Sequence, residues 1–348
     1  MQNARIAGVA TAVPRYRVDQ DTITSVAPSV FGPSFQDFRR LLPVFANTQV
    51  RTRYFSQPIE WFLRPHTFQE ANEIYTETAF ELAQKAAQAV MEQSRVPAEA
   101  IGMIVFASTS GIATPSLDSK LIQTLGLSRN IPRIPIWGLG CAAGVAGLAR
   151  AAELSSALDG RYLLLITVEL CSLTFQLGDL SKANVVATSL FGDGAAALLI
   201  GTEGDGPEIL ASYSHLWDDS ADIMGWELVD TGLKVRLSRD IPSLVRTEMP
   251  KLLDASAAAW GISRRDIRHY VLHPGGAKVL EAFAETTCID PAVLEHSYWV
   301  LHEYGNMSSP TFLFALRHFL DTTPRKGDLG LMLAFGPGFC AEQLLFRW

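Results

Sequence analysis

The stretch IWGLGCAAGVAG, residues 136–147, places Cys141 between a glycine and a run of alanines and glycines. It follows an apolar segment typical of a β-strand, and its small residues continue into a predicted helix, residues 141–158. Small residues allow close helix packing, in which a free cysteine behaves as a small hydrophobe. They also leave a thiol accessible to a substrate. This strand-to-helix junction indicates an α/β fold and leaves both roles of the thiol open.

Strand and helix signals alternate along the whole chain. The pattern predicts a strand over 4–14 and a long amphipathic helix over 70–94, where apolar residues recur at intervals of three and four. Continuous apolar strands separated by helices indicate a sheet covered on both faces, so we expect a layered α/β body of two similar halves. The halves are residues 1–204 and 205–348, divided in the segment GTEGDGPE. Further strands are predicted at 100–111, 131–139, 161–170, 194–201, 208–217, 228–238, 267–276 and 327–338, and further helices at 115–125, 244–260, 276–286 and 308–320.

The composition narrows the class of protein. The 348 residues are 48% hydrophobic and 19% charged, and the net charge of −7 argues against general nucleic-acid binding. No segment approaches the about 20 apolar residues of a membrane helix, and residues 1–14 do not resemble a signal peptide. The four cysteines form no Cys-x-x-Cys pair, so neither a zinc site nor a disulfide framework is indicated. We therefore expect a cytoplasmic protein.

Two later segments carry groups that could act with Cys141. His273 ends an apolar strand in YVLHPGG, and Asn306 lies at a Gly-Asn turn before a helix in YGNMSSP. Each residue alone is more simply a hydrogen-bonded structural or capping residue. Together the three supply a nucleophile, a proton partner and a carbonyl-orienting donor, which suits acyl-thioester chemistry. The N-terminus of the helix at Cys141 is expected to lower the thiol pKa below about 8.5.

Several motifs carry a resemblance that covers essentially the whole chain. GLGCAAGVAGL, SLFGDGAAALLIG, HPGGAKVLE, YGNMSSP and FGPG occur in the order and at about the spacing of the chalcone synthase-like type III polyketide synthases of the thiolase superfamily. GNMSS and FGPG favour this family over ketoacyl-ACP synthase III. The resemblance implies a thiolase-like αβαβα fold, a homodimer, and an internal site reached through a narrow tunnel.

The resemblance also assigns roles to residues. It implies that Cys141 accepts the acyl group, that His273 and Asn306 assist decarboxylation and condensation, and that Phe191 is the gatekeeper between tunnel and cavity. An imidazolium at His273 would stabilise the Cys141 thiolate, and His273 and the Asn306 amide would hold the enolate oxygen formed from malonyl-CoA. The implied substrates are acyl-CoA and malonyl-CoA. This chemistry requires no metal and no redox cofactor.

Departures from the plant pattern concern the substrate. Val235 stands where plant chalcone synthases carry a second gatekeeper phenylalanine, Cys171 stands where they have a threonine, and Trp226 where they have a glycine. QPIEWFL and MGWEL resemble bacterial alkylpyrone and alkylresorcinol synthases, and with Val235 they favour a medium or long fatty acyl-CoA starter. The product would then be a cyclic pyrone or resorcinol. The other positions that match the family's cavity lining are Thr109, Ser110, Thr174 and Ser308.

The phosphates of CoA need cations at the tunnel mouth. Arg39, Arg40, Arg51 and Arg53 lie where this family often gathers basic residues, although solvated arginines would give the same pattern. Two other functions stay open from the sequence, namely a single-round condensing enzyme fed by acyl carrier protein and a catalytically idle acyl-binding homologue. The number of extensions and the mode of cyclisation depend on cavity shape and ordered water, which the sequence does not reveal.

Overall fold

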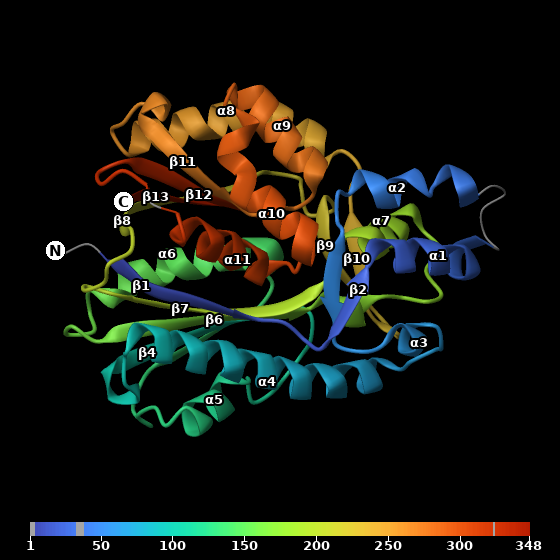
Figure 1. Cartoon of the computed structure of the whole chain (residues 1–348), viewed down its shortest axis with the longest axis horizontal. Coiled ribbons are helices and arrows are strands. Elements are labelled where there is room, and N and C mark those ends of the chain that lie inside the picture. The colour runs from blue at the N-terminus through green and yellow to red at the C-terminus, as the bar shows by residue number, and fades with distance from the viewer. Residues whose placement is uncertain (1–3, 33–37, 323) are drawn as a thin grey trace.

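The central feature of the computed structural model is a mixed sheet in two parts (Figure 1). The structure describes residues 4–32, 38–322 and 324–348. The parts are joined by one residue pair between β1 and β8, Arg5 with Glu208. The first part has the order β5 (Arg133–Ile136), β4 (Ile101–Ala107), β6 (Tyr162–Leu170), β7 (Asp193–Gly201) and β1 (Arg5–Ala12). The second has the order β8 (Glu208–Leu216), β13 (Cys340–Arg347), β12 (Leu329–Gly336) and β11 (Ile267–Leu272).

Helices cover both parts of the sheet and separate them (Figure 1). The outer face of the first part packs against α4 (Phe68–Ser94) and α5 (Asp118–Thr124) in one apolar core. A second core contains α6 (Ala143–Ser155) and α11 (Ser309–Leu320), which lie between the two parts. A third joins the second part to α8 (Ile241–Ala259) and α9 (Ala277–Thr287). The expected αβαβα layering is confirmed.

Most of the remaining elements gather at one end of the layers, to the right in Figure 1, whereas α10 (Glu295–Tyr304) lies nearer the middle, beside α11. They include two short antiparallel pairs, β2 with β3 and β9 with β10. Short 3-10 turns also occur, and three of them, Phe38–Arg40, Gly140–Ala142 and Cys171–Thr174, carry predicted site residues. The elements are β2 (Tyr16–Asp19), α1 (Gln20–Phe31), α2 (Pro43–Asn47), β3 (Thr52–Phe55), α3 (Ile59–Phe62), α7 (Lys182–Leu190), β9 (Met224–Val229), β10 (Gly232–Leu237) and α10 (Glu295–Tyr304).

The small residues after Cys141 serve close packing. A Cβ atom on Gly144 would lie 2.5 Å from the Ser309 carbonyl oxygen, and one on Gly147 would lie 2.9 Å from a methyl of Leu165. Helix α6 can therefore touch both α11 and β6, which places Cys141, just before α6, between the layers. Any larger side chain at these two positions would push the layers apart.

One expectation from the sequence needs correction, and several elements were not expected. Residues 228–238, predicted as one strand, form most of the β9–β10 hairpin, whose strands are separated by Asp230 and Thr231. The elements that the sequence does not predict are α1, α2, α3, α7, α10, β2, β3 and β13. None of the helices in the described residues combines the length and the hydropathy of a membrane span.

Candidate active site

Cys141 is held at the junction that the sequence predicts, in the 3-10 turn Gly140–Ala142 before α6. Gly140 has a φ of +45°, and a Cβ atom there would lie 2.9 Å from the ring of Pro337. The residue before Cys141 therefore has to be glycine for both conformation and space. The Gly140 N–H donates to Oγ1 of Thr109 at 3.2 Å, which ties this turn to the end of β4.

His273 and Asn306 come from the second half of the chain and lie close together. His273 follows β11, is 4% exposed, and has no hydrogen-bond partner within the described residues on either ring nitrogen. Asn306 lies between α10 and α11, where its Nδ2 donates to the Gly275 carbonyl at 3.3 Å and its Oδ1 accepts from the Ser308 N–H at 2.7 Å. The Gly275 N–H in turn donates to the His273 carbonyl at 2.9 Å. The carboxamide is thereby fixed beside the imidazole.

A cavity of about 320 Å³ brings the three residues together. Cys141, His273, Asn306 and Ser308 line it, together with Phe191, Trp226, Val235 and Phe335. The sulfur of Cys141 lies 3.4 Å from Oγ of Ser308. A thiol, an imidazole with two free nitrogens and a fixed carboxamide thus face one largely apolar space, as nucleophilic attack on a thioester followed by enolate stabilisation requires. Their catalytic roles stay predictions.

Burial dominates the electrostatics of this site. It raises the pKa of Cys141 to about 11, against the effect of hydrogen bonds from Ser308 and Asn306 that favour the thiolate. Burial also lowers the pKa of His273 to about 3. Both shifts favour the uncharged thiol and the uncharged imidazole, because desolvation opposes the charged forms more strongly than the nearby donors favour them. The expected thiolate–imidazolium pair stays a prediction.

Glu169, on β6, is a site residue that the sequence analysis missed. Its carboxylate accepts hydrogen bonds from the N–H groups of Thr109 at 2.9 Å and Ser110 at 2.8 Å, and from Oγ of Ser309 at 3.1 Å. Burial raises its pKa to about 7, and its negative charge raises the pKa of Cys141. A single acid in the apolar run YLLLITVEL was the only signal available in the sequence.

Thr109 and Ser110 lie outside the cavity and support the backbone around Cys141. Neither is among the residues that line the cavity, contrary to the expectation from the resemblance. Thr109 links Glu169 to the Gly140 turn, and Oγ of Ser110 accepts from the Leu170 N–H at 2.8 Å. Their side chains hold the Cys141 turn against β6 and do not face the substrate space.

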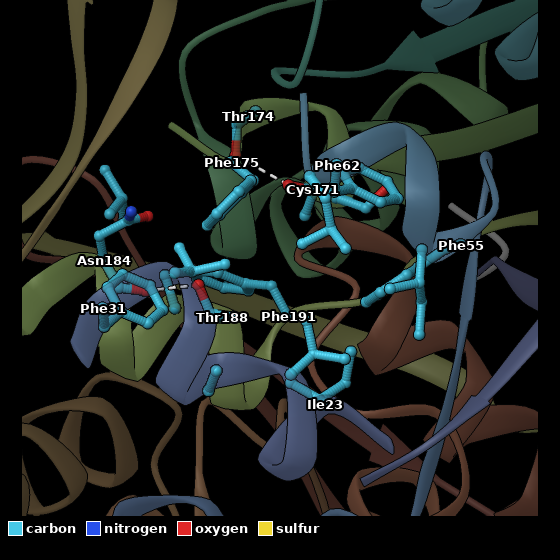
Figure 2. A pocket seen from close by; sticks show the side chains of 18 residues that line it. Ile23, Phe31, Phe55, Phe62, Cys171, Thr174, Phe175, Asn184, Thr188 and Phe191 are labelled. Atoms are coloured by element: carbon cyan, nitrogen blue, oxygen red, sulfur yellow. Dashed lines mark hydrogen bonds between the residues drawn. The ribbon is translucent and has the colours of Figure 1, made fainter. Parts of the chain in front are cut away.

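Phe191 and Val235 separate the main cavity from a second chamber of about 80 Å³, because both residues line both spaces. Trp226 pairs with Val235 across the β9–β10 hairpin, and its ring centroid lies 6.3 Å from that of Phe191. Cys171 and Thr174 line only the second chamber (Figure 2). Of the predicted lining residues, Trp226 and Ser308 belong to the main cavity and Cys171 and Thr174 to the chamber behind the gate.

The arginines predicted to bind CoA do not line the cavity. Arg53 is fully buried, so it cannot meet a phosphate at the tunnel mouth, and that expectation is wrong. Arg51 is exposed and ion-paired with Glu303, while Arg39 and Arg40 are exposed on the turn before α2. Cationic residues that do line the cavity are Arg236, Arg239 and Lys278.

Comparison with known proteins identifies the family. A model of the N-terminal domain of chalcone and stilbene synthases matches residues 3–204, and a model of their C-terminal domain matches residues 208–348. The chain belongs to the chalcone and stilbene synthase family.

Relatives within the chalcone and stilbene synthase family match over nearly the whole chain. A protein of Bacillus subtilis (strain 168) that bears a chalcone synthase name is 40% identical, with 99% of both chains covered. The 1,3,6,8-tetrahydroxynaphthalene synthase of Streptomyces peucetius subsp. caesius is 35% identical, with 99% of this chain and 93% of the relative covered. The crystal structure of 1,3,6,8-tetrahydroxynaphthalene synthase from Streptomyces coelicolor A3(2), a bacterial type III polyketide synthase, has a TM-score of 0.94 at 30% identity, with 99% of both chains covered.

These matches decide the class of reaction. The protein is a type III polyketide synthase and therefore an acyltransferase, and the family acts on CoA thioesters. A single-round condensing enzyme fed by acyl carrier protein and an idle acyl-binding homologue are not favoured. The division of the chain between residues 204 and 205 stays a prediction.

Proposed function

We propose that this type III polyketide synthase loads a medium- or long-chain aliphatic acyl-CoA starter onto Cys141 and extends it with malonyl units. The chamber behind Phe191 and Val235 is the observation that carries this proposal. It adjoins the Cys141 cavity, so an acyl chain attached to the sulfur could extend past the gate. Figure 2 shows aromatic and aliphatic side chains converging on this space, among them Ile23, Phe31, Phe55, Phe62 and Phe175.

The chemistry of the chamber wall favours a hydrocarbon. Each methylene that moves from water into such a wall contributes about 0.8 kcal/mol. The polar donors in the wall are already used. Ser172 donates to Asp193 at 2.5 Å, Thr174 and Thr188 donate to backbone carbonyls at 2.8 and 2.7 Å, and both Nδ2 hydrogens of Asn184 bind carbonyls. A starter with hydroxyl groups would leave those groups unpaired there, which costs binding free energy.

In the proposed loading step, the thiol of Cys141 and the imidazole of His273 both start uncharged. As the Cys141 sulfur attacks the thioester carbonyl, the neutral imidazole of His273 accepts the thiol proton, and the CoA thiolate leaves. That leaving thiolate can take the proton back from His273. Because ionisation of both groups is costly in the buried site, the ion pair forms only when the substrate carbonyl takes up the negative charge.

Extension needs the carboxamide. Malonyl-CoA loses CO2, and the electron pair of the broken C–C bond forms an enolate. The second Nδ2 hydrogen of Asn306 and an N–H of His273 are positioned to donate to the enolate oxygen, since only one Nδ2 hydrogen is occupied by the Gly275 carbonyl. The enolate carbon then attacks the Cys141 thioester carbonyl, the new C–C bond forms, and the bond between that carbonyl carbon and the Cys141 sulfur breaks. The extended chain is released as a β-ketoacyl-CoA that can reload the sulfur, and the released Cys141 thiolate takes up a proton from solvent. Every step uses side chains of this chain and the two thioesters, so we propose that no metal or redox cofactor takes part.

We assign CoA binding to the mouth of the cavity. Arg239 is 94% exposed, and Lys278 is exposed at the start of α9, so both can reach phosphate groups in solvent. Arg236 is held by Asp222 and Glu227 and contributes less free charge. We also propose that the product is a cyclic pyrone or resorcinol, that the enzyme acts as a homodimer, and that it is cytoplasmic.

A panel of starters tests the proposal. Purified enzyme is incubated with malonyl-CoA and acyl-CoAs graded from acetyl to palmitoyl, with aromatic acyl-CoAs and with malonyl-CoA alone, and products are identified by mass spectrometry. We expect the highest kcat/KM for medium or long aliphatic starters and no product from Cys141→Ala. A clear preference for aromatic starters, or for malonyl-CoA as starter, would refute the aliphatic assignment.

A further inference from the structure

Arg53 is the largest fully buried side chain in the described residues, and its guanidinium caps the C-terminal end of helix α7. It lies on β3, and its Nη1 donates to the carbonyl oxygens of Thr188 at 2.8 Å and Phe191 at 3.0 Å. Burial lowers its pKa only to about 9, so it keeps its positive charge at neutral pH. A cation at the C-terminal end of α7 complements the partial negative charge of the helix end.

Gln20 and Asn306 complete this cap. Nη2 of Arg53 donates to Oε1 of Gln20, and Nε2 of Gln20 donates to the Ser189 carbonyl at 2.9 Å. The backbone N–H of Asn306 donates to the Leu190 carbonyl at 2.9 Å. Four consecutive carbonyls, residues 188–191, thus have partners from other parts of the chain. Phe191 ends helix α7 with an extended backbone, and Gly192 after it does not take the left-handed conformation of a capping glycine, so these partners replace the usual C-cap.

Strand β3, which carries Arg53, supports the backbone at Phe191 and also the backbone before Asn306. Phe191 and Asn306 form a backbone bridge, in which the Gly192 N–H donates to the Asn306 carbonyl at 2.9 Å. Oγ1 of Thr52, next to Arg53, donates to the Glu303 carbonyl at 2.7 Å, which holds the end of α10 just before Asn306. The gatekeeper and the carboxamide therefore share one support, and β3 provides it.

We propose that Arg53, held by Gln20, is a positioning residue that fixes Phe191 and Asn306 relative to Cys141 and thereby sets which starter lengths pass the gate. The selectivity part rests on the proposed aliphatic starter. Phe191 is the wall between cavity and chamber, so a shift of its backbone changes the width of the passage. The same shift moves the Asn306 donor away from the enolate oxygen. Arg53 touches neither substrate and acts through the two backbone segments.

Arg53→Lys tests this inference, because lysine keeps the charge but cannot donate in two directions from a planar group. The measurements are the kcat/KM ratio of a long to a short acyl-CoA, decarboxylation of malonyl-CoA without starter, alkylation of Cys141, and thermal unfolding. We expect the ratio to change about tenfold and decarboxylation to fall several-fold, while alkylation stays within about twofold. Arg17→Gln is the matched control, because Arg17 is an exposed arginine on the adjoining strand β2, and it should change none of these.

A double variant separates positioning from general loosening of the fold. In a Phe191→Leu background the gate is already altered, so Arg53→Lys should change the starter ratio less than about twofold. An equal change in both backgrounds, or an unchanged ratio and decarboxylation rate in a variant that unfolds like wild type, would overturn the proposal. If Arg53→Lys does not fold, Gln20→Met removes the Gln20 bonds to Arg53 and to the Ser189 carbonyl but keeps the Arg53 bonds to Thr188 and Phe191, and the same shifts are expected. Should the wild type prefer no aliphatic starter, the proposed starter fails, whereas starter-free decarboxylation still decides whether Arg53 positions Asn306.

Discussion

The sulfur of Cys141 lies 3.4 Å from the hydroxyl oxygen of Ser308. Ser308 has a φ of +57° and a ψ of −130°, a conformation that side-chain-bearing residues rarely adopt. Its N–H is held by Oδ1 of Asn306 at 2.7 Å, which stabilises this strained turn. Strain of this kind is retained where a side chain must be aimed, and here it directs a hydroxyl at the nucleophile.

Replacing Ser308 with alanine should make the Cys141 thiolate harder to form. The Ser308 hydrogen bond lowers the pKa of Cys141, so its loss raises that pKa further, and the thiolate fraction at a given pH falls. We expect alkylation of Cys141 by iodoacetamide to slow by about three- to tenfold. Mass spectrometry can follow the reaction in a Cys288→Ser background, which removes an exposed competing thiol. Equal rates in Ser308→Ala and its parent would show that the hydroxyl does not favour the thiolate.

Glu169 should make stability depend on pH. Its pKa is about 7 in the folded protein against 4.5 ordinarily, so the folded state holds a proton that the unfolded state has released. Stability from this group is therefore present below pH 4.5 and is lost as the pH rises towards 7. The variant Glu169→Gln does not lose stability in this way. The free energy of unfolding of the variant minus that of wild type should therefore rise by about 3 kcal/mol between pH 4.5 and pH 7. Urea unfolding of both proteins at several pH values checks this, and parallel curves would contradict it.

Val235→Phe should narrow the passage to the second chamber. The new ring would stand beside Phe191 and Trp226, where the valine now leaves room between the two spaces. We expect kcat/KM for a long acyl-CoA to fall by at least about tenfold, and that for a short one to change by less than about threefold. Val235→Ile, a smaller enlargement, is the matched control and should give an intermediate ratio. A uniform fall for all starters would point to general damage of the hairpin instead.

Arg239 and Lys278 should contribute to the KM for both CoA thioesters. Because these exposed cations line the mouth, Arg239→Gln and Lys278→Gln should each raise KM by about three- to tenfold with little change in kcat. The effect should shrink at high ionic strength, since salt screens exposed charges. Arg246→Gln provides a control, because that arginine is exposed on α8, pairs with Glu285 and does not line the cavity. A lower kcat without a change in KM would place these residues elsewhere in the reaction.

The sequence predicts those parts of the fold whose signal is local. Strands such as β4 and β6 are continuous apolar runs, which the sequence shows directly. Cys141 and His273 follow predicted strands, so the same pattern places them at strand ends. Helix α7 was missed because KANVVATSL has two valines and two β-hydroxy residues, which are weak helix formers. It is stabilised by the Ser181 cap at its start and by Arg53 and Gln20 at its end. These last contacts join segments more than 130 residues apart, which no local pattern reveals.

The same limit explains the errors at the site. A buried arginine and an exposed one are indistinguishable in RTRYF, so the sequence predicts a CoA ligand at Arg53, whereas the structure buries that side chain completely. Arg239 and Lys278 reach the mouth from a segment after β10 and from the start of α9, and only tertiary packing places them together. Burial also raises the pKa of Cys141 and lowers that of His273, and it depends on the layers that enclose the two side chains.

The proposed homodimer should form through the edge of the sheet at β5. This strand ends the first part of the sheet, and Trp137, directly after it, is 59% exposed beside Ile112, which is 43% exposed. Nε1 of Trp137 donates to the Gly111 carbonyl at 3.3 Å, so the indole is held in place with its apolar face outward. An open strand edge with a fixed apolar patch favours pairing with a second copy.

We expect the wild type to elute as a dimer in size-exclusion chromatography with light scattering, and Trp137→Asp to elute as a monomer. Leu228→Asp is the control, since Leu228 is 66% exposed on the β9–β10 hairpin and should leave the dimer intact. A dimer that survives Trp137→Asp and dissociates with Leu228→Asp would move the interface from the sheet edge to the hairpin.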